Sequence, residues 1–159
     1  MIDSDGFRAN VGIVLCNDQG QLFWCRRAGG IDAWQFPQGG IKQDEDTETA
    51  MYRELREEVG LLPEHVEIIA STDDWLRYWL PEQFIRHNTQ PVCIGQKQIW
   101  YLLRLLVDES FVNLSNTNKP EFDHWCWINY WDPVKQVIEF KRKVYEQALQ
   151  QLEPFLFTR

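Results

Sequence analysis

The sequence contains no long hydrophobic run, and this absence excludes a membrane-spanning segment within its 159 residues. A membrane helix needs about 18 or more consecutive apolar residues, and every apolar run in this sequence is much shorter. The first residues, MIDSDGFRAN, are acidic and polar, whereas a secretory signal begins basic and continues apolar. We therefore expect a protein of the cytoplasm.

Cysteine and histidine are also scarce, with four and three residues respectively. The cysteines at positions 16, 25, 93 and 126 form no CxxC motif and no cluster with histidine. This pattern excludes a zinc site of the usual spacing and gives no sign of a disulfide framework. We expect reduced thiols that pack in the core or in strands.

Positive charge is the third shortage, because 16 Lys and Arg residues stand against 24 Asp and Glu residues, for a formal net charge of −8. A protein that coats nucleic acid needs many Lys and Arg contacts to phosphates, so that class is excluded, whereas a phosphorylated substrate is not. Several acidic residues lie between positions 44 and 58, where bound divalent cations would neutralise them. Basic residues gather at 26–27 and 141–143.

The residues that are present predict an α/β domain. A chain that is 44% hydrophobic has the composition of a globular protein, and its length predicts a single domain over residues 1–159. Apolar segments predict a β-hairpin of residues 11–16 and 22–27, and further strands at 34–36, 66–72, 91–96, 97–107 and 124–130. The segment after Pro133 predicts an amphipathic helix with an irregular beginning. Strands interleaved with two helices indicate a mixed sheet covered by helices.

The other helix is expected between Asp46 and Gly60. Asp46 suits the N-cap position, and Gly60 suits the left-handed conformation that follows a last helical turn. At about 100° per residue, Met51, Leu55 and Val59 share one apolar sector. This helix should therefore pack on one side.

Three carboxylates adjoin that apolar sector. Glu54, Glu57 and Glu58 lie at spacings i, i+3 and i+4, where like charges destabilise an isolated helix by about 0.2–0.5 kcal/mol per pair. Mg²⁺ prefers oxygen ligands and commonly bridges carboxylates to substrate phosphates, so a bound cation would remove this repulsion. The alternative is a solvated acidic face with an ion pair between Arg53 and Glu57.

The stretch GGIKQDEDTETAMYRELREEVGL, residues 39–61, resembles the signature of the Nudix hydrolases at every specified position. The resemblance implies a Nudix α/β/α sandwich and hydrolysis of a nucleoside diphosphate linked to another moiety. It also implies a requirement for Mg²⁺ or Mn²⁺, with more than one ion.

The resemblance and the helix geometry together give Glu54, Glu57 and Glu58 as metal ligands. The backbone carbonyl of Gly39 is a further candidate ligand, because paired glycines let the chain approach an ion closely. Glu54, Glu57 and Arg53 are expected catalytic residues by the same resemblance.

Two acids outside the helix complete the scheme. Family members use the position of Glu45 to orient the loop through Arg53. Glu121, in NKPEFDHWCW, precedes a predicted strand, and the sequence alone leaves open whether it is a surface acid. Because RNA pyrophosphohydrolases carry a PEFD-like stretch here, the resemblance implies that Glu121 is a catalytic residue, as a further metal ligand or general base.

Segments outside the signature resemble the RNA pyrophosphohydrolase branch of the family almost from end to end. They are DGFRANVGIVLCN, WQFPQGGI, WLRYWLP, PVCIGQKQIWYLLRL and EFKRKVY. This branch removes pyrophosphate from the triphosphate at an RNA 5′ end and leaves a monophosphate that initiates mRNA decay. A single-stranded, triphosphorylated RNA end is therefore the expected partner.

Five residues are expected to bind that substrate. Basic side chains recognise phosphate oxygens, and aromatic side chains stack on unpaired bases. The basic candidates are Arg8, Arg27 and Lys141, and the aromatic candidates are Tyr78 and Phe140. Each residue taken alone suits core packing or a solvated surface, so the assignment depends on the resemblance.

Other functions stay open from the sequence alone. The same branch is similar to dinucleoside polyphosphate hydrolases, and an enzyme that clears small nucleotides has the same signature. A non-enzymatic alternative is a Nudix-fold nucleotide-binding module without activity, although such proteins usually have a broken signature. Ala33 stands where many relatives carry a serine, and this departure removes a hydroxyl contact that would bear on base preference.

Overall fold

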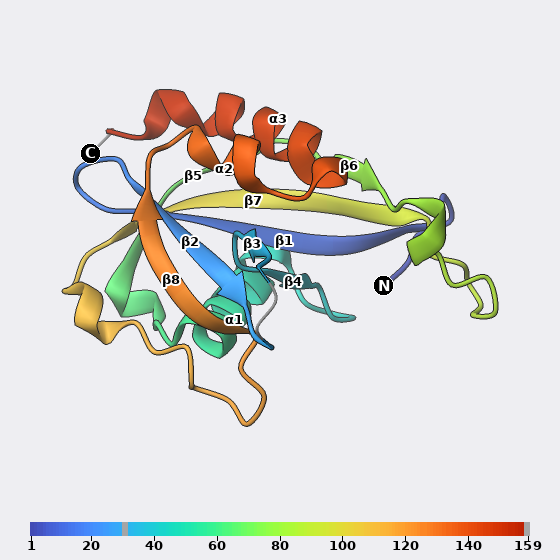
Figure 1. Cartoon of the computed structure of the whole chain (residues 1–159), viewed down its shortest axis with the longest axis horizontal. Coiled ribbons are helices and arrows are strands. Elements are labelled where there is room, and N and C mark those ends of the chain that lie inside the picture. The colour runs from blue at the N-terminus through green and yellow to red at the C-terminus, as the bar shows by residue number, and fades with distance from the viewer. Residues whose placement is uncertain (30–31, 158–159) are drawn as a thin grey trace.

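The structure, a computed structural model, describes residues 1–29 and 32–157. Figure 1 shows a central sheet with α3 on one side and α1 on the other. The strands run in the order β3-β2-β1-β7-β5, and β4, β6 and β8 pair with β1, β7 and β2 respectively. Their bounds are β1 Phe7–Cys16, β2 Leu22–Arg27, β3 Trp34–Gln35, β4 Gln38–Gly40, β5 Val66–Ser71, β6 Leu76–Trp79, β7 Gly95–Leu105 and β8 Phe122–Ile128. The helices are α1 Thr47–Val59, α2 Asp132–Gln136 and α3 Arg142–Leu152.

The sheet is mixed, as the sequence predicts. β1 runs parallel to β7 from the pair Phe7 and Gly95 to the pair Cys16 and Arg104. The strands that pair with β2 and the strands β4, β5 and β6 are all antiparallel to their partners. The parallel pair joins segments that lie far apart in the chain, so it forms the centre around which the hairpins are arranged.

Two apolar layers hold the helices to this sheet. On the α3 side, the rings of Trp24, Phe36, Trp100 and Tyr145 pack edge to face or at a tilt, with centroids 4.9–6.2 Å apart. On the α1 side, the predicted apolar sector is fully buried against β1, β2 and β7. Burial of each such side chain stabilises the fold by about 1.5–3 kcal/mol relative to exposure. The first layer thus holds α3, and the second holds α1, against opposite faces of the sheet.

The predicted hairpin and most predicted strands are confirmed. Cys16 pairs with Leu22 across the turn, and all four cysteines are free thiols. The strand predicted at 91–96 is wrong over residues 91–94, because β7 begins at Gly95. Pro91 has no N–H to donate, and Ile94 makes single backbone bonds to Gly6 and Leu80 instead of a ladder.

The predicted C-terminal helix is broken in two. Val137 has extended backbone angles, φ −70° and ψ 156°, and ends α2. A 3₁₀ turn, Glu139–Lys141, then leads into α3. The break turns Phe140 and Lys141 toward the cleft described below. Within the described residues, no helix has the length and apolar character needed to cross a membrane.

Candidate active site

Helix α1 begins and ends where its capping residues predict. The side chain of Asp46 accepts a hydrogen bond of 2.7 Å from the backbone N–H of Thr49. Gly60 has φ 78°, and its N–H donates to the carbonyls of Leu55 and Arg56. A side chain at position 60 would also meet the carbonyl of Asn113 at 2.5 Å. The positions of the acidic residues along the helix are therefore fixed at both ends.

Arg53 is the centre of the acidic cluster. Its guanidinium donates twice to Glu45, at 2.7 and 2.9 Å, and once to the carbonyl of Gly40 at 2.8 Å. It also donates to Glu54 at 2.7 Å and to Glu57 at 3.3 Å. The hydrogen bonds from Arg53 lower the pKa of Glu45 from 4.5 to about 2. The expected pairing of Glu45 with Arg53 is thus present, and it ties the loop before α1 to the helix.

Glu54 and Glu58 are buried, each with 8% of its surface exposed. Burial raises the pKa of Glu54, although Arg53 opposes the shift. Burial, followed by the charges of Glu54 and Glu121, raises the pKa of Glu58 well above its usual value. The backbone N–H of Gln38 donates to Glu58 at 3.1 Å and is its one hydrogen bond among the described residues. The pair therefore carries more negative charge than its protein surroundings neutralise.

Gly39 allows the strand before α1 to touch this cluster. A Cβ atom at position 39 would lie 2.0 Å from the carboxyl carbon of Glu54, so no other residue fits without displacing that carboxylate. The Gly39 backbone, Glu54 and Glu58 accordingly lie together, as the sequence predicts.

These oxygen donors fit a divalent cation in their chemistry. The unneutralised charge on the buried pair is what a hard cation such as Mg²⁺ would stabilise. In the part of the chain that the structure describes, however, no three acidic, histidine or cysteine side chains are arranged to hold an ion. Arg53 instead holds one oxygen each of Glu54 and Glu57. Of the sequence alternative, the ion pair of Arg53 with Glu57 is present, but the face is not a solvated one, because Glu54 and Glu58 are buried.

Glu121 immediately precedes β8, as expected, and its carbonyl accepts a hydrogen bond of 2.9 Å from Ala28. Its carboxylate lies 4.0 Å from the guanidinium of Arg27 and raises the pKa of Glu58 by repulsion. Glu121 is thus near the α1 cluster without being part of it.

A cleft opens beside these carboxylates. One hollow of about 260 Å³ is lined by Gly39, Glu121, Arg27, Tyr78, Phe140 and Lys141, among others. It continues into a larger hollow of about 510 Å³ that shares Arg27, Phe140 and Lys141 and includes Ala33. We call the two together the main cleft. It brings four of the five predicted substrate residues next to the acidic cluster.

Lys141 and Tyr78 meet inside the main cleft. The ammonium of Lys141 lies 5.8 Å from the centre of the Tyr78 ring. Burial and the neighbouring charge of Arg27 lower the pKa of Lys141 from 10.5 to about 8, and Glu121 opposes the shift. Burial raises the pKa of Tyr78 to about 12.

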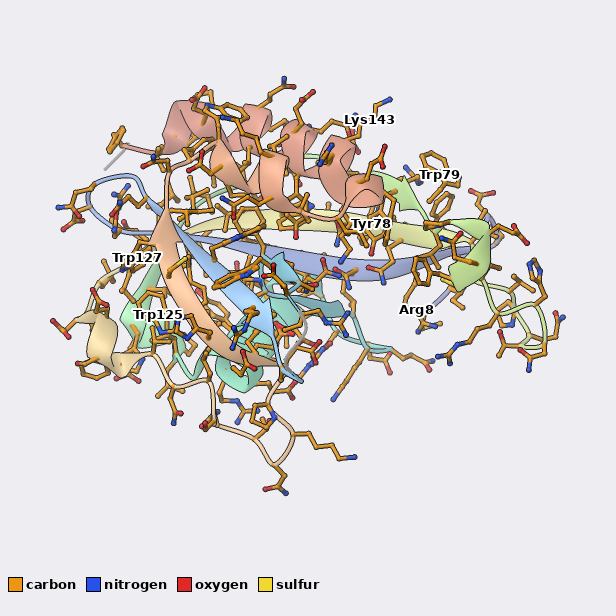
Figure 2. All side chains as sticks on the ribbon, in the orientation of Figure 1. Arg8, Tyr78, Trp79, Trp125, Trp127 and Lys143 are labelled. Carbon is orange, nitrogen blue, oxygen red and sulfur yellow. The ribbon has the colours of Figure 1, made fainter. Side chains whose placement is uncertain are left out.

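The prediction that Tyr78 offers an open ring to a base needs correction. Only 4% of Tyr78 is exposed, because its ring packs on Phe140 with centroids 5.8 Å apart and belongs to the core beneath α3. Phe140 covers it and is the more accessible of the two. Figure 2 shows Tyr78 inside the fold, whereas Arg8 projects from the sheet at a separate place. Arg8 does not line the main cleft and lines a neighbouring hollow instead.

Sequence reasoning missed a row of amide side chains under the cleft. The buried Gln98 donates to Asn10 at 2.9 Å and to Gln38 at 3.4 Å, and Gln38 donates to Gln96 at 3.5 Å. Asn10 and Gln98 face each other across β1 and β7. The signal was available, because polar residues that interrupt buried apolar strands are usually hydrogen-bonded and positioned for a reason.

Comparison with known proteins agrees with this geometry. The model of the NUDIX domain family matches residues 6–148. The chain is 58% identical to the RNA pyrophosphohydrolase of Hahella chejuensis, over 100% of this chain and 98% of the relative. It is 60% identical to the RNA pyrophosphohydrolase of Pseudomonas putida strain F1, over 100% of this chain and 99% of the relative.

Solved structures of low sequence identity share the fold. The dihydroneopterin triphosphate pyrophosphohydrolase of E. coli superimposes with a TM-score of 0.71 at 18% identity and covers 91% of this chain and 98% of its own. An Ap4A hydrolase of C. elegans in a binary complex gives a TM-score of 0.63 at 19% identity, over 92% of this chain and 97% of its own. Nudix hydrolases generally use divalent metal ions. On the family match and these full-length identities, the chain belongs to the Nudix family.

Proposed function

We propose that this Nudix protein is an RNA pyrophosphohydrolase. It would hydrolyse the triphosphate at a single-stranded RNA 5′ end, release pyrophosphate and leave a 5′ monophosphate, the step that initiates mRNA decay. The observation that best supports this proposal is the position of the main cleft. Its basic and aromatic walls, Arg27, Lys141 and Phe140, open directly onto the Gly39 backbone and Glu121 beside the α1 carboxylates. The curated relatives with the same name support this assignment.

The walls of the main cleft would hold the 5′ end. Arg27 and Lys141 would bind phosphate oxygens, since guanidinium and ammonium groups form strong charge-assisted hydrogen bonds. Phe140 would stack on an unpaired base, and the buried Tyr78 would support its ring from below. Ala33 lines the wider part of the cleft and contributes only a methyl group there. A cleft of this size contacts few phosphates, so the net charge of −8 does not oppose binding.

The residues of α1 would hold Mg²⁺ or Mn²⁺, with more than one ion. Glu54, Glu57, Glu58 and the Gly39 carbonyl would be the ligands, and Glu121 a further one. When bound, such ions neutralise charge on the phosphates and lower the pKa of a coordinated water. Arg53 holds one oxygen of Glu54 and one oxygen of Glu57, so the second oxygen of each carboxylate is left for an ion.

The protein side chains divide the remaining work. A water molecule attacks a phosphorus atom of the triphosphate, the phosphoanhydride bond breaks, and pyrophosphate leaves with the bonding electron pair. Glu121 would accept the proton of the attacking water as general base. Arg53 is better described as a positioning residue, because it contacts Glu45, Glu54 and Glu57 rather than the cleft. RNA decay takes place in the cytoplasm, and we place the reaction there.

A competition between substrates tests the proposal. The assay measures kcat/KM for triphosphate-ended RNA of about ten unpaired nucleotides, diadenosine tetraphosphate and free nucleoside triphosphates at equal concentration and saturating Mg²⁺. We expect RNA to be preferred. A preference for diadenosine tetraphosphate by orders of magnitude would assign the chain to dinucleoside polyphosphate hydrolysis instead. Binding of all three without hydrolysis would identify a nucleotide-binding module.

A further inference from the structure

A third hollow adjoins the two hollows of the main cleft. It has a volume of about 350 Å³ and lies between Arg8 of β1 and the loop of residues 80–94 that joins β6 to β7. We call it the loop pocket. Its volume is at the lower end of the range of about 300–1,000 Å³ that small-molecule sites occupy. Figure 2 shows Arg8 at this end of the sheet, away from Trp125 and Trp127 on β8.

The loop pocket is positively charged in a protein that is negative overall. Arg8 and Arg86 both line it, and none of its lining residues among those described is Asp or Glu. The nearest acid on the same loop, Glu82, is 2.6 Å from His87 and lies outside the lining. Two arginines converging on one hollow without a carboxylate are a site for an anion such as a phosphodiester.

An aromatic row links the loop pocket to the main cleft. Phe84 lines both, and half of its surface, 52%, is exposed. Its ring lies 5.9 Å from Phe140, which in turn lies 5.8 Å from Tyr78. Leu80 and Gln96 also line both spaces. Because the two spaces share these lining residues, a ligand that stacks on Phe140 in the main cleft can extend over Phe84 into the loop pocket.

The remaining lining supplies hydrogen-bonding groups of the kind that contact bases and ribose. Gln90 and Gln96, which carry amide side chains, both line the pocket. Gln96 accepts a bond from Gln38, so its own amide N–H groups remain to donate. An aromatic ring, two guanidinium groups and amides around one hollow match the parts of a nucleotide.

We propose that the loop pocket is a second nucleotide subsite, which binds the nucleoside and phosphate that extend beyond the part of the substrate held in the main cleft. This inference rests on the proposed function. The chemistry could come from the next nucleotide of an RNA strand or from the distal nucleoside of a dinucleoside polyphosphate. An RNA strand would continue beyond the loop pocket, whereas a dinucleoside polyphosphate would end in it.

A length series with loop variants tests the subsite. The substrates are a triphosphorylated dinucleotide and a triphosphorylated tetranucleotide, assayed for kcat/KM, with binding constants measured without divalent metal. For the wild-type chain we expect the tetranucleotide to bind more tightly. In Arg86→Ala, loss of one charge-assisted contact should weaken tetranucleotide binding about tenfold and leave the dinucleotide unchanged. The slope of log K against log salt should fall by about 0.7 for the tetranucleotide only.

Phe84→Ala should also remove the tighter binding of the tetranucleotide relative to the dinucleotide. It should not change the slope of log K against log salt, because it removes stacking and no charge. Lys143→Ala is the matched control. It removes one exposed positive charge from the first turn of α3, lines none of the three hollows discussed, and lies on the other side of β1 and β7 from Arg8 in Figure 2. It should leave the length gain intact.

The outcomes separate this inference from the proposed function. If Arg86→Ala lowers diadenosine tetraphosphate hydrolysis relative to ATP but does not alter the RNA length series, the subsite stands and its occupant is the distal nucleoside. If the wild-type chain hydrolyses the dinucleotide but neither variant changes the length gain or the ratio of the small substrates, the subsite is refuted while the proposed function survives. If no RNA is hydrolysed at all, the proposed function fails, and the small-substrate ratio alone then decides for or against the subsite.

Discussion

The buried pair Glu54 and Glu58 on α1 should lower the free energy of unfolding of the metal-free protein. Glu54 and Glu58 are one helical turn apart, so their Cβ atoms are separated by about 5–6 Å. Burial first, and then the charge of Glu54, raises the pKa of Glu58, so above the usual pKa of a glutamate this side chain destabilises the metal-free fold whether it stays charged or takes up a proton. If both are charged, two unit charges about 6 Å apart repel by about 3 kcal/mol at an effective dielectric constant of about 20. Arg53 neutralises part of this through Glu54, whereas Glu58 has no cationic partner among the ion pairs of the described residues.

Glu58→Gln should therefore stabilise the metal-free protein. The substitution removes one charge and keeps an oxygen to accept the bond from Gln38. We expect a gain of about 1–2 kcal/mol after neutralisation by Arg53 is allowed for, which corresponds to a rise in Tm of about 2–8 °C for a domain of this size. The measurement is thermal unfolding near neutral pH in the presence of a chelator. Activity should be lost in the same variant, because one of the proposed metal ligands is removed.

Added Mg²⁺ provides the second half of this test. It should raise the Tm of the wild type more than that of Glu58→Gln, since a cation stabilises the state that binds it. Glu48→Gln is the control, because Glu48 is an exposed acid in the first turn of the same helix. Its Tm should stay level or fall slightly through the helix dipole. A Glu58→Gln protein that melts at or below the wild type in chelator, or gains equally from Mg²⁺, would refute the reasoning.

Three further predictions follow from the site. Glu121→Gln should lower kcat by about 10²–10⁴-fold with a much smaller change in KM, and steady-state kinetics with unchanged kcat would remove Glu121 from the mechanism. Lys141 has a lowered pKa of about 8, so its charge is present below that pH and lost above it. KM should therefore rise as the pH increases through about 8, and Lys141→Arg should remove this dependence of KM on pH. Gly39→Ala should displace the Glu54 carboxylate, which a Cβ would approach to 2.0 Å, and should abolish activity while circular dichroism shows a folded protein; full activity would show that the close approach is unnecessary.

Local chemistry explains which parts of the fold the sequence could predict. Helix α1 was predictable to its ends because Asp46 and Gly60 act on their own neighbours. The hairpin of β1 and β2 was predictable for the same reason. The four-residue β6 was missed because it is short and lies at a sheet edge, where its pairing with the distant β7 defines it. The prediction of one domain over residues 1–159 stays a prediction.

The site was predictable in composition but not in arrangement. The spacing of the glutamates placed them on one helix face and offered the ion pair of Arg53 with Glu57 as an alternative, but it did not show that Arg53 would also bind Glu54. The prediction of Tyr78 depends on the family resemblance, which does not show its burial; that burial involves Phe140, which the break between α2 and α3 brings over it. The amide row under the cleft depends on the parallel pairing of β1 with β7, so no local pattern specifies it completely.

The most direct test of the account is calorimetric titration of Mg²⁺ into the metal-free protein in the presence of a non-hydrolysable nucleoside polyphosphate. The acidic face of α1 should bind the ion with a saturable heat, and the double variant Glu54→Gln, Glu57→Gln should lose that heat while its fold, followed by circular dichroism, is retained. A wild-type chain that shows no saturable Mg²⁺ binding under these conditions, or a double variant that binds as well as the wild type, would contradict the central claim that these carboxylates form the metal site.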